Sequence, residues 1–168
     1  MPGPYDELSA RVSAFHVRVS DRHPGGLTCH AGCSSCCHRH LSVMTLEWSR
    51  IAEAVSSLEP SHQEALRTRL EAGRSDPRCP LLDDEGRCRI YEARPMICRT
   101  HGLPIQVGEP PKRDVCPLNF PDGPEVETLD DDLVLDVNRL NLTVGVIAEM
   151  EGTDPTERVD LFDGLADL

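Results

Sequence analysis

Residues 28–40, with the sequence TCHAGCSSCCHRH, constrain the fold of this chain more than any other stretch. Thiolate and imidazole are the usual protein ligands of zinc and of iron–sulfur clusters. The segment therefore predicts a metal site. It contains four of the eight cysteines, Cys29, Cys33, Cys36 and Cys37, and three histidines, His30, His38 and His40.

The spacing of these cysteines limits how they can bind one metal. If residues 29–37 were helical, all four cysteines would fall within an arc of about 100°. The helical rise, however, would separate Cys29 from Cys37 by about 12 Å, whereas a zinc–sulfur bond is about 2.3 Å long. Either the segment is partly a loop, or its cysteines divide between metals or around a larger cluster. In both divided cases the remaining ligands come from elsewhere, and the candidates are Cys79, Cys88, Cys98 and Cys116.

Composition narrows the class of protein. A chain of 168 residues fits one domain with tails. It contains only three Phe, two Tyr and one Trp, so we expect a bound metal to carry part of the stability. The formal charge of −12 argues against binding to nucleic acid or to an anionic membrane surface.

The start of the chain also bears on its compartment. It shows no basic region followed by an apolar run, and no stretch approaches the length of a membrane span. We therefore expect a cytoplasmic protein, in which clustered cysteines bind metal or do redox chemistry more often than they form disulfides.

Apolar periodicity predicts a mainly α fold. Helical spacing of apolar residues indicates helices over 5–20, from Thr45 to Pro60, and over 130–150. Ser61 and Glu64 form a capping-box pattern for a further helix that fades near Gly73. The acidic run at 130–132 suits the start of the 130–150 helix, and Asp154-Pro155 is expected to start a last short helix.

Residues 74–124 differ in character, because they hold most of the prolines and the other four cysteines. The segment 79–91 predicts a short hairpin with its turn at 83–86, which would bring Cys79 and Cys88 together. One or two helical turns are expected over 92–100, and mostly loop over 102–123. We expect a single domain over 1–168, with an N-terminal helix and linker (5–27), a metal-binding core organised around its metal (28–124) and a C-terminal helix with an acidic tail (125–168).

Three further residues are candidates for the site. His101 lies three residues after Cys98, on the same side of a helix, and is a spare metal ligand. The other histidines are expected to be solvated. Arg94 and Arg99 would either lie beside the thiolates as cofactor-binding cations that tune them, or hold loop carbonyls and carboxylates as structural residues.

The cysteine pattern as a whole resembles the bacterial CxxCxxCC family of zinc- or iron-chelating proteins, often labelled iron–sulfur cluster proteins. The resemblance accounts for all eight cysteines in order over 29–116, and the run Ile-Tyr-Glu-Ala-Arg-Pro-x2-Cys-Arg from 90 to 99 is its most specific part. The first gap is three residues here, where the family name has two. The resemblance implies a metal-binding domain, and a flagellin lysine methylase with a similar cluster suggests that some relatives are enzymes.

Three functions follow from these observations. The first is an iron–sulfur or iron protein in redox work, with a protein redox partner or a small-molecule substrate. The second is a zinc-organised interaction module without catalysis. The third is an enzyme that acts at an open metal position, for which the sequence identifies no catalytic residue.

Overall fold

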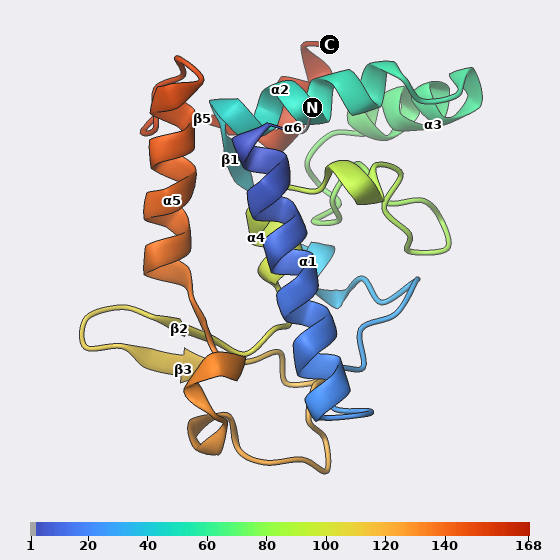
Figure 1. Cartoon of the computed structure of the whole chain (residues 1–168). Helices are drawn as coiled ribbons and strands as arrows, with labels where there is room; N and C mark the ends of the chain where they lie inside the picture. The colour runs from blue at the N-terminus through green and yellow to red at the C-terminus, as the bar shows by residue number, and fades with distance from the viewer. Residues whose placement is uncertain (1–2) are drawn as a thin grey trace. The chain divides into compact units, whose positions relative to one another are not determined.

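The computed structural model describes residues 3–168, and over that range it contains six α-helices and two small sheets (Figure 1). The expectation of a mainly α fold is confirmed. The chain divides into two compact units. Unit 1 consists of residues 3–29 and 96–147, and unit 2 consists of residues 30–95 and 148–168. None of the helices described over 3–168 has the length and apolar character that a membrane span requires.

Unit 1 begins with α1 (Pro4–Arg22), close to the predicted helix over 5–20. Pro4 at the first helical position fits because its missing N–H needs no partner there, and the Gly3 N–H donates to the Asp6 carboxylate at 2.9 Å. Val12, Phe15 and Val19 are buried, as their spacing predicts. The short helix α4 (Met96–Thr100) contacts α1.

A three-stranded sheet in unit 1 was not expected from the sequence. β2 (Ile105–Val107) pairs antiparallel with β3 (Lys112–Asp114) and parallel with β4 (Leu135–Asp136). The prediction of mostly loop over 102–123 is wrong for this hairpin, which Figure 1 shows beside α5. Arg113 stabilises the sheet because it donates to the Leu129 carbonyl at 2.6 Å and pairs with Asp131.

Helix α5 (Val137–Met150) starts seven residues later than the predicted 130. A 3₁₀ helix, Asp131–Leu133, and the short strand β4 occupy the intervening segment. The acidic run at 130–132 therefore does not lie in the first turn of α5. Leu133 and Val134 are still buried, since an extended segment can bury the same apolar residues as a helix. They belong to the core of unit 1, with Phe15, Val19, Leu103, Phe120 and Leu129.

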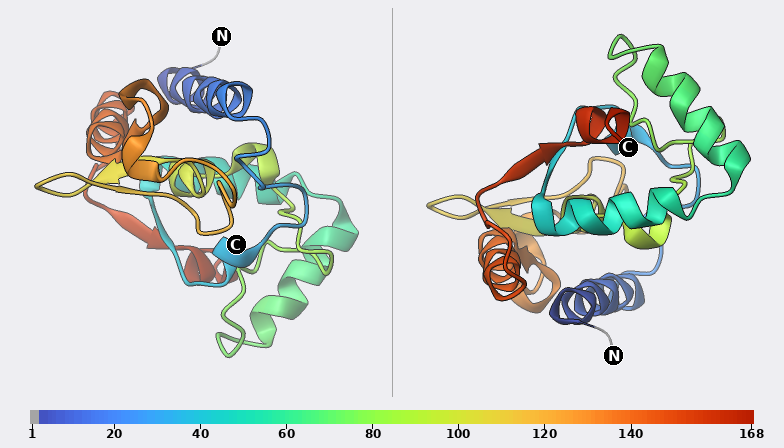
Figure 2. Two further views of the ribbon diagram at one scale, coloured as in Figure 1. Left: turned by 90° about the horizontal axis from the view of Figure 1, so that it is seen from below. Right: turned by 90° about the horizontal axis from the view of Figure 1, so that it is seen from above.

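Unit 2 contains the helical hairpin of α2 (Thr45–Ser56) and α3 (Pro60–Glu71), seen as a V in Figure 2. The predicted cap at Ser61 is wrong, because Pro60 is already the first residue of α3 and Glu59 is the cap. β1 (Ser42–Met44) pairs antiparallel with β5 (Arg158–Asp160). The core of unit 2 consists of Val43, Ile51, Val55, Leu66, Leu81, Ile90, Leu161 and Leu165.

The last helix, α6 (Leu161–Ala166), follows β5. The prediction of a helix from Asp154 is wrong, because the Asp154 carboxylate instead accepts from the Thr156 backbone and closes a turn. Asp160 caps α6, where its carboxylate accepts from the backbone N–H groups of Phe162 and Asp163. The expectation of one domain with three segments stays a prediction, as does the organisation of residues 28–124 around a metal.

Candidate metal centre

The eight cysteines are all free thiols, and they divide between the two compact units. Residues 29–37 are not an α-helix: they form a loop that ends in a 3₁₀ turn, Ser35–Cys37. The boundary between the units falls directly after Cys29. Unit 1 therefore contains Cys29, Cys98 and Cys116, and unit 2 contains Cys33, Cys36, Cys37, Cys79 and Cys88.

In unit 1, two cysteines lie against the backbone of Gly102. A Cβ atom added to Gly102 would lie 3.0 Å from the Cys29 Sγ and 3.8 Å from the Cys116 Cβ. Gly102 also has a φ of +93°, a left-handed conformation that favours glycine. Only glycine fits here without displacing Cys29. The position lies just after α4, which carries Cys98, and His101 precedes it.

Asn119, which was not among the residues predicted for the site, fixes the Cys29 segment in place. Its side chain is 5% exposed. The Asn119 Oδ1 accepts from the Thr28 backbone N–H at 2.9 Å, and the Nδ2 donates to the Gly102 carbonyl at 2.5 Å. The same Nδ2 lies 3.7 Å from the Cys29 Sγ. An amide beside a thiolate is the kind of outer-shell partner that orients a metal ligand. Its only signal in the sequence is its place three residues after Cys116.

In unit 2, Cys36 and Cys37 lie in the 3₁₀ turn with their sulfur atoms 3.9 Å apart. Two thiolates bound at about 2.3 Å with tetrahedral angles have sulfur atoms about 3.8 Å apart. The Cys79 backbone N–H donates to the Cys37 carbonyl at 2.7 Å, so Cys79 joins this pair through the backbone. The geometry is compatible with shared ligation of one metal.

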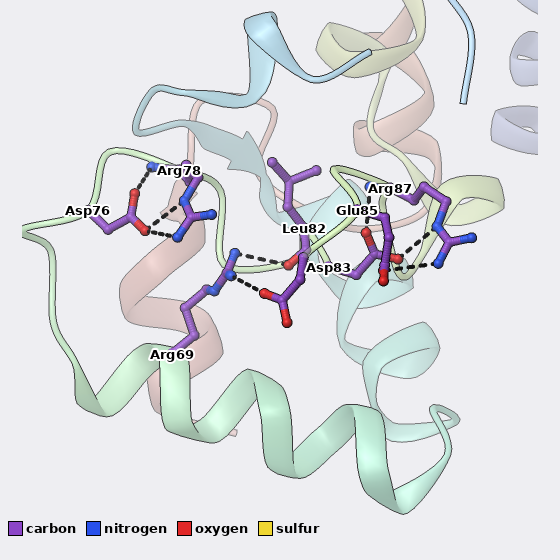
Figure 3. A network of polar contacts seen from close by, with 8 residues as sticks. Arg69, Asp76, Arg78, Leu82, Asp83, Glu85 and Arg87 are labelled. Carbon is purple, nitrogen blue, oxygen red and sulfur yellow. Dashed lines mark hydrogen bonds and ion pairs between the residues drawn. The ribbon is translucent and has the colours of Figure 1, made fainter. Parts of the chain in front are cut away.

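Cys88 and Cys79 lie at the two ends of the predicted hairpin. In the structure, the strands of this hairpin are replaced by a single β-bridge between Leu82 and Cys88. The turn is closed by a hydrogen bond from the Asp83 N–H to the Arg87 carbonyl at 2.9 Å. Figure 3 shows the side chains that hold this loop: Arg87 bonds Asp83 at 2.9 Å, and Arg69 of α3 donates to the Leu82 carbonyl at 3.0 Å. These ion pairs are largely exposed and worth little individually, but together they fix the chain between the two cysteines.

The Cys33 segment packs against the same loop through two glycines. A Cβ atom on Gly32 would lie 3.3 Å from the Glu85 carbonyl oxygen, and one on Gly86 would lie 3.0 Å from the Gly32 oxygen. Both glycines have a positive φ. The loop that carries Cys33 therefore contacts the turn of the 79–88 hairpin by close backbone approach. That ligands are drawn from both cysteine groups stays a prediction.

Three thiols of unit 2, those of Cys36, Cys79 and Cys88, have a raised pKa and so favour the protonated form. The hydrogen bond to Cys37, burial and the neighbouring Cys37 charge all raise the pKa of Cys36. Burial raises the pKa of Cys79 to about 11, and burial also raises the pKa of Cys88. Crowded, partly buried thiols favour the neutral form unless a cation offsets their charge. A bound metal ion would supply that charge and convert the thiols to ligands.

Of the two candidate arginines, Arg94 lies in unit 2 with Cys88, and Arg99 lies in unit 1 with Cys98. Arg94 stacks over the Tyr91 ring at 3.5 Å and donates from Nε to the Tyr91 carbonyl at 2.9 Å. It also acts electrostatically on Cys88, whose pKa it lowers against the larger effect of burial. Arg99 lies in the last turn of α4, directly after Cys98. The contacts with Tyr91 support a structural role for Arg94. The cofactor-binding roles of Arg94 and Arg99 stay predictions.

Arg89, next to Cys88, has a buried Nε without a hydrogen-bond partner among residues 3–168. A buried donor left unpaired costs about 1–3 kcal/mol. Sulfur atoms of a metal–thiolate centre accept such N–H groups, so this orphaned donor fits an acceptor supplied with the metal.

Within residues 3–168, no three Cys, His, Asp or Glu side chains are gathered in a geometry that could hold a metal ion. The thiols come together in pairs and through backbone contacts rather than as a closed ligand set. His101 is half-buried, whereas His30, His38 and His40 are exposed, as expected of solvated residues. The chemistry of the donors, all thiol with one histidine, nevertheless fits zinc or iron.

Comparison with known proteins agrees with this donor set. The CxxCxxCC family, described as a "Putative zinc- or iron-chelating domain", matches residues 28–117, which is just over half of the chain and includes every cysteine. No curated protein matches the chain, and no solved structure matches it. The chain therefore belongs to the CxxCxxCC family of zinc- or iron-chelating domains.

Proposed function

We propose that this chain is a redox protein in which the cysteines ligate iron, either as iron ions or in iron–sulfur clusters. The observation that carries the proposal is the presence of eight free thiols divided into a set of three and a set of five. One structural zinc takes four ligands and a [4Fe–4S] cluster also takes four. The five thiols of unit 2 exceed the number that either centre takes. Iron is favoured by the vicinal Cys36-Cys37 pair, which adds soft donors that a zinc scaffold does not need.

The residues have distinct roles in this proposal. In unit 2 the ligands come from Cys33, Cys36, Cys37, Cys79 and Cys88, and Arg89 supplies an N–H donor beside them. In unit 1 they come from Cys29, Cys98 and Cys116, with His101 as the fourth donor and Asn119 orienting Cys29. When bound, iron supplies one-electron chemistry. A protein redox partner or a small-molecule substrate in a reducing compartment such as the cytoplasm completes the proposed function.

A zinc-organised module without catalysis is the second candidate. The observation in its favour is the 3.9 Å separation of the Cys36 and Cys37 sulfur atoms, which matches two ligands of a tetrahedral zinc ion. Three cysteines and one histidine in unit 1 are likewise a usual zinc ligand set. For the third candidate, an enzyme, no catalytic residue is identified within the described part of the chain.

Purification without oxygen, followed by metal analysis and an absorbance spectrum, separates the two. Iron–sulfur clusters are coloured and zinc is not. Reconstitution with iron and sulfide should then give a reversible redox signal between roughly −700 and +450 mV. The part of that signal that comes from unit 2 should be lost in Cys36→Ser, and the part that comes from unit 1 in Cys98→Ser. Stoichiometric zinc that iron cannot replace, with no redox signal, would establish the zinc module instead.

A further inference from the structure

Helix α5 exposes an apolar stripe. Leu142, Val146 and Met150 are 73%, 56% and 69% exposed. Their spacing of four residues aligns them along one face of the helix. The opposite face is buried through Leu140 and Val144. A single exposed apolar side chain is ordinary, but three in line form a continuous exposed apolar face.

The stripe is flanked by two opposite charges on the same face. Arg139 lies three residues before Leu142, and Glu149 lies three residues after Val146. Both residues are exposed. Neither side chain forms an ion pair with another residue of 3–168. The face thus combines an apolar centre with a base near one end and an acid near the other.

We propose that this face is a self-association surface, on which a second copy of the chain packs its own α5 in antiparallel orientation. A two-fold axis makes each contact occur twice, so the surface must be complementary to itself. In an antiparallel pair, the register that places Arg139 opposite Glu149 of the second copy also places Leu142 opposite Val146. One register therefore satisfies both the charges and the apolar residues, which favours a second copy over an unrelated partner.

The size of the stripe determines how strong the dimer is. A face of one four-turn helix buries less than the roughly 1,000 Å² expected of a stable interface. The charge of −12 on each copy also opposes association. The dimer is therefore weak and reversible, with a dissociation constant in the micromolar to millimolar range.

Sedimentation equilibrium of the full metal-loaded chain, in reductant and at physiological ionic strength, tests the proposal. The wild-type chain should shift from monomer to dimer as its concentration rises. Leu142→Glu should remain monomeric, since it places a charge in the apolar centre. The matched control is Val17→Glu on α1, because Val17 has the same 56% exposure as Val146 but lies outside the stripe, and it should dimerise like the wild type.

A charge exchange tests the register. Arg139→Glu alone, or Glu149→Arg alone, should raise the dissociation constant of the dimer about tenfold. Each substitution removes two ion pairs and places like charges opposite each other. The double variant should restore dimerisation, because the pair is re-formed with the charges exchanged. A wild-type chain that is monomeric at every concentration, an equal loss in Val17→Glu, or a double variant no better than the single ones would overturn the proposal.

Discussion

Replacing Asn119 by alanine tests whether the Cys29 segment is held as the structure indicates. The substitution removes the acceptor of the Thr28 backbone N–H and the donor to the Gly102 carbonyl. Gly102 is buried, so its carbonyl loses its partner without access to water. Thr28 is half-buried, and its hydroxyl keeps the Leu118 carbonyl, 2.8 Å away, as a partner.

The expected cost follows from these contacts. A buried polar group left unsatisfied costs about 1–3 kcal/mol. The Gly102 carbonyl should bear that full cost and the Thr28 N–H a smaller one, so we expect Asn119→Ala to destabilise unit 1 by about 2–4 kcal/mol. The matched control is Asn138→Ala, which also removes an amide-to-carbonyl bond, 3.2 Å long to Gly108, but at an exposed site. It should cost less than about 0.5 kcal/mol.

The assay must report on unit 1. Trp48 is the only tryptophan and lies in unit 2, so fluorescence would follow the wrong unit. Amide hydrogen exchange of α1 and α5 during urea titration gives the free energy of opening directly. If Asn119→Ala and Asn138→Ala cost the same, or if both cost less than about 0.5 kcal/mol, the reasoning from buried hydrogen bonds is wrong.

Three further predictions concern the same site. Gly102→Ala should lower the free energy of unfolding by about 1–3 kcal/mol and lower the metal content, because the φ of +93° is strained for alanine and the new Cβ would contact the Cys29 Sγ. Urea unfolding measures the stability and metal analysis the metal content; an unchanged metal content would contradict the prediction. Arg89→Met should leave the metal-free stability unchanged or raised while lowering metal affinity, because the Nε it removes has no partner among residues 3–168; a competitive chelator titration gives the affinity, and a loss of metal-free stability would argue against an orphaned donor. Removing the metal should cost several kcal/mol and abolish amide protection over 79–116 before it affects α2, α3 and α5, and protection that is unchanged over 79–116 would rule this out.

The helices predicted best are those whose local sequence is sufficient to specify where the helix begins and which face is buried. α1 has apolar residues at spacings of three and four and a proline at its first position, and both signals are local. The predicted start of α5 was wrong because Leu133 and Val134 extend the apolar pattern to residues before the helix, which form a 3₁₀ turn and a strand. Periodicity indicates which residues are buried, and Leu133 and Val134 would be buried in an α-helix as they are in the observed 3₁₀ turn and extended segment.

The β2–β3 hairpin was missed for a different reason. Its strands are three residues long, and the second, Lys112–Asp114, is charged throughout. The first, Ile105-Gln106-Val107, alternates apolar and polar residues, but over three residues this is too short to predict a strand. Its order depends on partners distant in sequence, namely β4 and the loop carbonyls that Arg113 bonds. Such contacts cannot be inferred from composition or spacing within the segment.

The metal-ligand types could be predicted, but their grouping could not. As a straight helix, residues 29–37 cannot close one mononuclear site, because the helical rise separates their thiols too far. The sequence carries no signal for the division between Cys29 and Cys33. That division depends on Asn119 and Gly102, which lie 90 and 73 residues beyond Cys29 and contact it only in the folded chain.

The division of the cysteines finally predicts how metal content responds to single substitutions. If the two sets bind separately, the loaded chain holds two metal centres. Zinc or a cluster requires four donors; unit 2 has five thiols, and unit 1 has three thiols with His101 as the fourth donor. Cys98→Ser should then remove only the centre of unit 1, and Cys79→Ser only that of unit 2. Additivity is expected because the sites share no ligand, so the double variant should lose both. Metal analysis of the four proteins decides the matter: if either single substitution removes all of the metal, the eight thiolates serve one centre and the separate-set assignment is wrong.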